Sequence, residues 1–288
     1  MEGVVSASPF VVQLNDEGTY HLNVQPNAQA LMRLAASAVV FWSRKAIERR
    51  GRFHLALSGG GTPKQLYQLL ATPEFAQQIF WECVHVWWGD ERDAPADHAD
   101  SNYKLAYDAL LSKTPIPPAN VHRVRTELGP QQAAAQYETE INFAFERLRV
   151  DEPTGAVVDS GGWPSFDLVL LGMGDDGHTA SLFPHSDALK DSDRLVVANY
   201  AESVKAMRIT FTAALINAAD TVIFLVSGAG KADMLKRVLL GDRAPNDLPS
   251  QLVAPVGKLF WMADAAAAAQ VASGPGYPDG EFIYRRAA

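Results

Sequence analysis

The chain has 288 residues, of which 48% are hydrophobic and 20% charged, and these proportions are typical of a globular protein with a sizeable core. Its net charge of −8 argues against a nucleic-acid-binding protein, because phosphate backbones are bound by basic surfaces. The single cysteine, Cys83, excludes an intramolecular disulfide and fits a reducing compartment.

The sequence does not predict a membrane or secreted protein. Its longest apolar stretch, 213–226, contains Asn217 and Asp220, which a membrane span would exclude. No basic and then apolar leader opens the chain, where Glu2 and Pro9 stand instead. We therefore expect a soluble, cytoplasmic protein.

Strand and helix patterns alternate along the chain. Residues 1–25 are predicted to form a flexible start and a short β ribbon that turns at 15–18. Apolar runs predict strands, which cover 53–57, 84–88, 166–171, 194–199, 208–211, 221–226 and 258–262. Amphipathic patterns and capping residues predict helices, which cover about 28–50, the segment after 62, 101–113, 130–149, 213–218, 231–240 and 263–271. Gly- and Pro-containing stretches predict a surface loop at 151–165 and a loose tail at 273–288.

This alternation predicts a doubly wound α/β fold, with a mostly parallel sheet and helices on both faces, in a single domain over 1–288. Four of the strands run into unusual loops, at 58–63, 89–92, 172–178 and 227–231. The carboxyl ends of parallel strands meet at one edge of a sheet, where ligands bind. We therefore expect the four loops to line one pocket.

The first loop has the composition of an anion site. Free backbone N–H groups at a helix N-terminus bind oxyanions, and Thr62 and Pro63 are typical of an N-cap and a first helical residue. A plain strand–helix turn is the alternative. Lys231, after the second glycine-rich turn, is either an anion ligand or a solvated lysine. The predicted phosphate loop consists of Ser58, Gly59, Gly60, Gly61 and Thr62.

Two nucleotide-binding patterns are excluded by their context. The turn before Lys231 lacks the first glycine and the Ser or Thr of a phosphate-binding P-loop. Residues 172–177 match the dinucleotide-binding glycine pattern, but Asp175 and Asp176 would repel a pyrophosphate, and Pro184 stops the helix that should follow.

The third loop carries the candidate chemistry. His178 follows Asp176 and a glycine at the predicted pocket, and we expect it to transfer a proton, with Asp176 orienting the imidazole. The alternatives are a capping or core histidine and a turn-forming aspartate. His54 and His85 lie inside strand patterns and are interpreted as structural.

Arg92 offers a planar fork to phosphate or carboxylate, or forms an internal salt bridge with Asp90 or Glu91. No cluster of histidines and cysteines has the spacing of metal ligands, so we predict no required metal.

Taken together, these motifs resemble the 6-phosphogluconolactonases of the glucosamine-6-phosphate isomerase/6-phosphogluconolactonase family. The resemblance spans about 28–262, in the family's order. Its most specific part is 176–184, Asp-Gly-His-Thr-Ala-Ser-Leu-Phe-Pro. The other matching segments are 58–63, 89–92, 101–103 and 231–232. Asp175 is a departure, because many members have glutamate there, and the loop at 151–165 is longer than usual.

The resemblance implies the fold of glucosamine-6-phosphate deaminase and ribose-5-phosphate isomerase. It also implies hydrolysis of 6-phospho-D-glucono-1,5-lactone, a step of the pentose phosphate pathway, without metal or cofactor. By position, His178 would be the general base, Arg92 and Lys231 with Asp90 would lie at the substrate, and the loop from Ser58 would hold its phosphate.

Two alternatives remain, an amino-sugar-phosphate deaminase or isomerase on the same fold and a non-catalytic sugar-phosphate sensor. The residues after His178 take the lactonase form, and nothing before residue 28 looks like a DNA-binding module. The substrate is thus expected to be a small phosphosugar lactone, with no nucleic acid or membrane partner, and the oligomeric state is left open.

Overall fold

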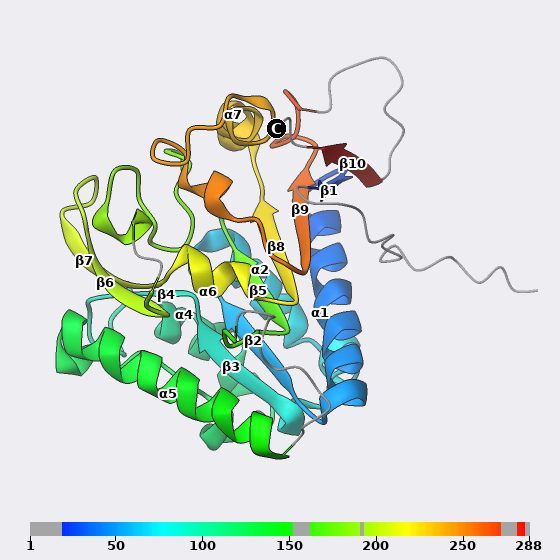
Figure 1. The fold of residues 1–288 in the computed structure, drawn as a ribbon. Coiled ribbons are helices and arrows are strands. Elements are labelled where there is room, and N and C mark those ends of the chain that lie inside the picture. The colour runs from blue at the N-terminus through cyan, green and yellow to red at the C-terminus, as the bar shows by residue number, and fades with distance from the viewer. Residues whose placement is uncertain (1–18, 152–161, 191–192, 272–280, 286–288) are drawn as a thin grey trace, which may run out of the picture.

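A computed structural model describes residues 19–151, 162–190, 193–271 and 281–285 of the chain (Figure 1). Its centre is a seven-stranded sheet in the order β10-β1-β9-β8-β5-β2-β3. All neighbouring pairs from β1 to β3 are parallel, and only β10 pairs antiparallel, with β1. The predicted, mostly parallel α/β sheet is therefore confirmed. Its strands are β1 (Thr19–Gln25), β2 (Phe53–Leu57), β3 (Val84–Trp88), β5 (Leu168–Leu171), β8 (Thr221–Val226), β9 (Lys258–Asp264) and β10 (Glu281–Arg285).

Helices cover both faces of this sheet (Figure 1). Neighbouring residues of one strand point to opposite faces. In β3, Trp87 packs in one core cluster with α5 and α7, and Trp88 packs in the other with α1 and α2. Both clusters share the sheet, and we propose on this ground that the chain forms a single domain. The helices are α1 (Ala28–Arg50), α2 (Gly61–Leu70), α3 (Pro73–Ala76), α4 (Asn102–Ala109), α5 (Pro130–Asp151), α6 (Ala213–Asn217) and α7 (Ala232–Leu240).

A small second sheet lies beside the carboxyl end of the main one. It has the order β4-β7-β6, with all pairs antiparallel, and is formed by β4 (Asp90–Arg92), β6 (Val196–Ala201) and β7 (Ala206–Phe211). β4 follows β3 after Gly89 alone, so it connects the two sheets directly. This connection places residues of the second sheet next to the edge where ligands are expected.

The structure corrects the predictions for both ends of the chain. Residues 19–25 do not form a separate ribbon, because β1 is inserted in the main sheet between β9 and β10. The predicted turn at 15–18 lies outside the described residues. The tail is not loose throughout, since residues 281–285 form β10 against the backbone of β1. An unpaired strand edge offers free N–H and C=O groups, and β10 satisfies those of β1.

Two internal predictions also change. Of the predicted surface loop at 151–165, residues 152–161 are not described, but Pro164 and Ser165 are buried where the chain enters β5. The predicted last helix at 263–271 is a series of turns. Asp264 ends β9 and accepts the Ala267 N–H with its side chain and the Ala268 N–H with its carbonyl, so the chain turns there instead of continuing as a helix.

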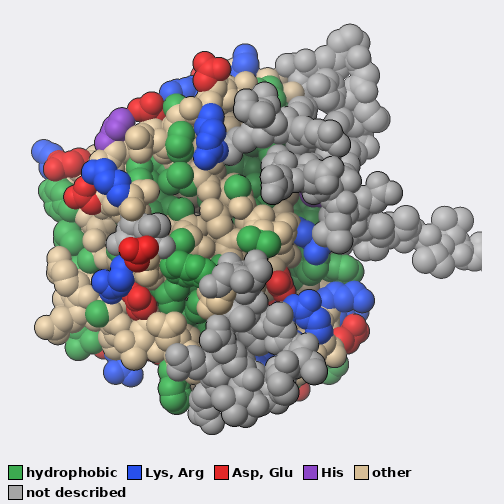
Figure 2. Space-filling model, viewed as in Figure 1, with side chains coloured by type: hydrophobic (Ala, Val, Ile, Leu, Met, Phe, Trp, Pro, Cys, Tyr) green, Lys and Arg blue, Asp and Glu red, His purple; other side chains and the backbone are tan. Residues whose placement is uncertain are grey.

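Of the described helices, none is long and apolar enough to cross a membrane. On the face shown in Figure 2, acidic and basic side chains of the described residues are interspersed.

Three histidines, His54, His85 and His122, form a stacked cluster. His54 and His85 lie near the starts of β2 and β3, away from the carboxyl ends of the strands. The rings of His54 and His85 lie 4.8 Å apart, His85 Nδ1 lies 3.1 Å from His122 Nε2, and His122 Nδ1 lies 2.8 Å from Glu140 Oε1. Burial, and then the neighbouring His85 and His122, hold the pKa of His54 well below its usual value. Burial and His122 lower the pKa of His85 to about 4.

We expect this cluster to make the fold sensitive to mild acid. The folded state resists protonation of His54 and His85, whereas the unfolded chain takes up these protons near pH 6.5. Stability is therefore full above that value and falls as the pH decreases towards 4. For His85 the loss between pH 7 and 5 is roughly 1–2 kcal/mol, a few degrees in Tm. His85→Gln should flatten the dependence of Tm on pH, and His98→Gln, at an exposed histidine, should not. Equal slopes for His85→Gln and the parent would contradict this role.

Candidate active site

A cavity of about 360 Å³ opens at the carboxyl ends of the parallel strands. The loops after β2, β5 and β8 line it together with β4, so the predicted convergence of four distant segments is confirmed. The hairpin between β6 and β7 adds a fifth side. The predicted site residues that line the cavity are Ser58, Gly59, Gly60, Asp90, Arg92, His178 and Lys231. Gly61, Thr62 and Asp176 do not line it.

The glycine loop after β2 is shaped by close packing. A Cβ on Gly59 would lie 1.8 Å from Asn102 Oδ1, so no side chain fits there. Gly60 has φ 103° and is the N-cap of α2, which corrects the predicted N-cap Thr62. A glycine adopts this φ without strain. The helix therefore begins at Gly61, two residues before the start that an N-cap at Thr62 predicts. Gly59 and Gly60 thus line the cavity directly before the N-terminus of α2, where the helix dipole favours an anion.

Ser58 contributes a buried hydroxyl group to the cavity. Its side chain is buried, and its hydroxyl forms no hydrogen bond with the described residues. The hydroxyl of Tyr67 holds the backbone of Ser58, because it lies 3.0 Å from the Ser58 nitrogen and donates to the Ser58 carbonyl at 2.7 Å. An unsatisfied buried hydroxyl is costly, and a ligand in the cavity would supply its partner.

His178 and Asp176 form a hydrogen-bonded pair beside the cavity. His178 Nδ1 lies 2.5 Å from Asp176 Oδ1, and the same oxygen accepts the His178 backbone N–H at 3.1 Å. Burial works against ionisation of Asp176, but the hydrogen bond and charge of His178 outweigh it and lower the pKa of Asp176. The carboxylate therefore holds a proton on Nδ1 and leaves Nε2 free to accept one. Phe183 stacks on the imidazole with ring centres 4.2 Å apart.

The loop from 172 to 178 is folded around this pair. The Gly174 N–H donates to the His178 carbonyl at 2.8 Å, and the Gly177 N–H donates to the Gly174 carbonyl at 3.2 Å. Gly177 has φ 80°, and its carbonyl accepts a hydrogen bond from the Ser250 hydroxyl at 2.8 Å. A Cβ on Gly174 would lie 2.1 Å from His178 Nδ1. The glycines thus allow the backbone to pass close to the imidazole.

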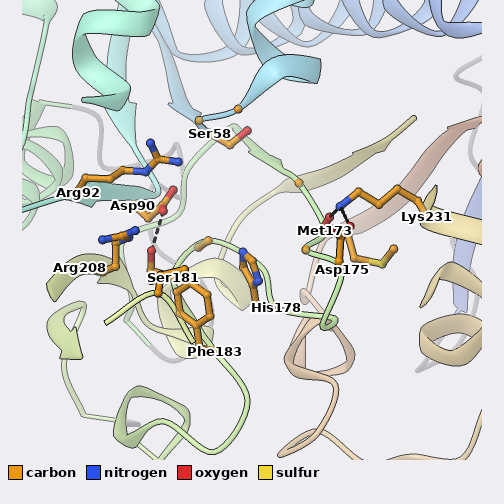
Figure 3. A pocket seen from close by; sticks show the side chains of 16 residues that line it. Ser58, Asp90, Arg92, Met173, Asp175, His178, Ser181, Phe183, Arg208 and Lys231 are labelled. Carbon is orange, nitrogen blue, oxygen red and sulfur yellow. Dashed lines mark hydrogen bonds and ion pairs between the residues drawn. The ribbon is translucent and has the colours of Figure 1, made fainter. Parts of the chain in front are cut away.

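Lys231 reaches the cavity from the turn before α7 (Figure 3). Its Nζ donates to the Met173 carbonyl at 2.8 Å and to Asp175 Oδ1 at 2.6 Å. Lys231 is therefore tied to the loop that carries His178, and its charge is partly neutralised.

Arg92 lies in a strand, β4, and not in the predicted loop. Asp90–Arg92 is a strand because it pairs with β7. Among the described residues Arg92 forms no ion pair with Asp90 or Glu91; its Nη1 donates to the Asp100 carbonyl at 2.7 Å. Glu91 is buried and accepts the backbone N–H groups of Arg92, Asn102 and Tyr103. The alternative of an internal salt bridge is therefore wrong, and the guanidinium lines the cavity.

Asp90 is also buried, and its Oδ2 accepts the Ser181 hydroxyl at 2.7 Å. The sequence analysis does not predict Ser181 or Arg208 as site residues, although both line the cavity. Arg208 lies in β7 and is the register partner of Arg92 in β4. A strand pattern at 208–211 was visible, but only the pairing of β4 with β7 shows that Arg208 belongs to the pocket. In the described part of the chain, no three His, Cys, Asp or Glu side chains are placed to hold a metal ion.

Comparison with known proteins identifies the family of the chain. Residues 26–261 match the model of the family described as glucosamine-6-phosphate isomerases/6-phosphogluconolactonase. A curated 6-phosphogluconolactonase from Synechocystis is 42% identical over 85% of this chain and 96% of its own length. The solved 6-phosphogluconolactonase of Trypanosoma brucei superposes with a TM-score of 0.75 and 27% identity, over 87% of this chain and 98% of that one.

A solved monomeric glucosamine-6-phosphate deaminase has a TM-score of 0.68 over 86% of this chain and 99% of that one. At 17% identity it shows the shared fold alone. The family match spans most of the chain, and it includes all four loops that meet at the cavity. The chain belongs to the glucosamine-6-phosphate isomerase/6-phosphogluconolactonase family.

Proposed function

We propose that the protein hydrolyses 6-phospho-D-glucono-1,5-lactone to 6-phospho-D-gluconate, the second step of the oxidative pentose phosphate pathway. The observation that carries the proposal is the His178–Asp176 pair beside a cavity that also holds a glycine loop and three cationic side chains. The names of relatives such as the Synechocystis protein support the choice of substrate. The single cysteine supports a reducing, cytoplasmic location.

In the proposed reaction His178 is a general base. Neutral Nε2 takes a proton from a water molecule as the water oxygen bonds to C1 of the lactone. The carbonyl oxygen becomes an oxyanion, which backbone N–H groups or a cationic side chain stabilise. The C1–O bond to the ring then breaks, and the imidazolium returns its proton to the ring oxygen. Asp176 keeps the required tautomer and stabilises the imidazolium between the two proton transfers.

The proposed role of the loop from Ser58 is to hold the 6-phosphate. Its backbone N–H groups lie at the start of α2, where the helix dipole favours an anion. Either Lys231 or Arg92 provides a cationic partner at the same cavity. These steps use only groups of the chain itself, water and the substrate.

A direct assay tests the proposal. The lactone is generated enzymatically in the cuvette, and acid release is followed with and without the protein, because the lactone also opens on its own. We expect release well above the blank. A folded protein that gives no rate above the blank would overturn the proposed function, and ammonia release from glucosamine 6-phosphate would then favour a deaminase.

The variant Ser58→Ala should weaken substrate binding without lowering the stability of the fold. The Ser58 hydroxyl has no partner among the described residues, so its removal should leave Tm unchanged or slightly raised. If the hydroxyl binds the phosphate, the loss of a hydrogen bond to a charged group should raise KM by roughly tenfold or more. Steady-state kinetics and thermal unfolding measure the two effects. An unchanged KM would show that Ser58 does not contact the substrate.

A further inference from the structure

Lys231 is held by two oxygen atoms of the loop that carries His178. Its Nζ donates to the Met173 carbonyl at 2.8 Å and to Asp175 Oδ1 at 2.6 Å. Lys231, Met173 and Asp175 all line the cavity, and Figure 3 shows the lysine side chain extending to this loop. An ammonium group has three N–H donors, so one donor remains for a ligand. A ligand that binds to Lys231 therefore shares its charge with Asp175.

Asp175 differs from the two other carboxylates near the site. Asp176 is paired with the imidazole of the base, and Asp90 is buried, where a serine hydroxyl donates to it. The side chain of Asp175 is 86% exposed, and among the described residues its carboxylate bonds only to Lys231. Asp175 thus affects the cavity through its charge and not through the packing of the fold.

This charge is unfavourable for an anionic ligand at Lys231. A phosphate or carboxylate oxygen that accepts the third N–H of Lys231 would lie close to the Asp175 carboxylate, since both would bind the same nitrogen. The two negative charges repel each other, and the repulsion grows with the charge of the ligand. Lactone hydrolysis adds such a charge, because the acid product has a carboxylate in addition to the phosphate. Asp175 therefore disfavours the product more than the lactone.

We infer that Asp175 is an internal counter-ion that competes with the anionic ligand for Lys231 and so weakens retention of the acid product. The inference rests on the proposed function, which supplies the charge of the product. Asp175 acts through Lys231 and has no role at the reacting atoms. The competition is modest, because an exposed ion pair changes an equilibrium constant by roughly two- to fivefold.

The test compares binding of 6-phosphogluconate to Asp175→Asn and to the parent by calorimetry. Asparagine keeps the size of the side chain and removes its charge. We expect Asp175→Asn to bind 6-phosphogluconate about two- to fivefold more tightly, with a product-inhibition constant lowered by the same factor. Asp175→Glu keeps the charge and should bind like the parent. Weaker binding by Asp175→Asn would mean that Asp175 positions Lys231 for the ligand, and this result or an unchanged affinity would overturn the inference.

Asp187→Asn is the matched control. Asp187 is also exposed and forms an ion pair with a lysine, since its Oδ1 lies 3.0 Å from Lys190 Nζ, but it does not line the cavity. The control removes the same charge from the chain and should bind 6-phosphogluconate like the parent. Equal tightening in Asp187→Asn and Asp175→Asn would assign the effect to net charge and contradict the competition at Lys231. Thermal unfolding shows that each variant is folded.

The dependence on Lys231 is tested in the Lys231→Gln background. If Asp175 competes for the lysine, adding Asp175→Asn to Lys231→Gln should change the affinity for 6-phosphogluconate much less than it does in the parent, because residues in contact are not additive. The same tightening in both backgrounds would show that Asp175 acts on the ligand without Lys231, and the inference would be wrong.

The inference and the proposed function fail in different ways. If the parent hydrolyses the 6-phospholactone and Asp175→Asn binds the product no more tightly, the counter-ion role is wrong and the function stands. If the parent hydrolyses no lactone, the function is wrong, and tighter binding of 6-phosphogluconate by Asp175→Asn still supports the competition for Lys231. If neither protein binds 6-phosphogluconate, both are wrong.

Discussion

His178→Ala should lower the kcat of lactone hydrolysis by about 10²–10⁴-fold, which is the usual contribution of a general base. Water is a poor nucleophile until a base takes its proton. In the cavity, Asp176 fixes Nδ1 of His178, so Nε2 is the nitrogen that can accept the proton. The glycine loop and the arginines are untouched by the substitution, so KM should change much less than kcat.

His185→Asn is the matched control. His185 is exposed, forms a surface ion pair with Asp247 and does not line the cavity, and asparagine tolerates its φ of 61°. It should keep the parent's rate. Parent-like turnover of His178→Ala would exclude His178 as the base.

Local sequence signals predicted the elements that carry the site. The prediction of a helix at 28–50 is confirmed as α1, which Asn27 caps through Oδ1 and which ends at Gly51 with φ 71°. Both ends depend on residue types with a strong local preference. The convergence of the four loops is confirmed as well, because it needed only a parallel sheet and the positions of the strand ends.

The wrong predictions depended on contacts distant in sequence. Asp90–Arg92 is a strand because β7 pairs with it, and β7 lies more than 100 residues further along the chain. Arg208 belongs to the pocket for the same reason. At 281–285 the tail becomes a strand only because β1 has a free edge. Thr62 has the residue type of an N-cap, but Gly60 reaches a conformation that begins the helix earlier. The residue pattern of one segment does not indicate which distant strand will pair with it.

Gly174→Ala should lower kcat about 10²-fold while leaving the protein folded. The added Cβ would lie 2.1 Å from His178 Nδ1 and 2.7 Å from Asp176 Oδ1, so the two side chains cannot keep their hydrogen bond in its present place. Both are partly exposed and can move aside, and the cost therefore falls on the position of the base and not on the core. A shift of about 1 Å in a catalytic group is enough for a loss of this size.

Gly230→Ala is the matched control, because a Cβ at Gly230 meets nothing within 4 Å. It should keep both Tm and kcat. The decisive comparison is made in the His178→Ala background. If Gly174→Ala acts only by displacing the imidazole, adding it to His178→Ala should lower the rate little further, since residues that act as a unit are not additive. An equal fold-loss in both backgrounds would mean that the alanine disturbs another part of the cavity, and parent-like activity of Gly174→Ala alone would show that the His178–Asp176 geometry does not limit turnover.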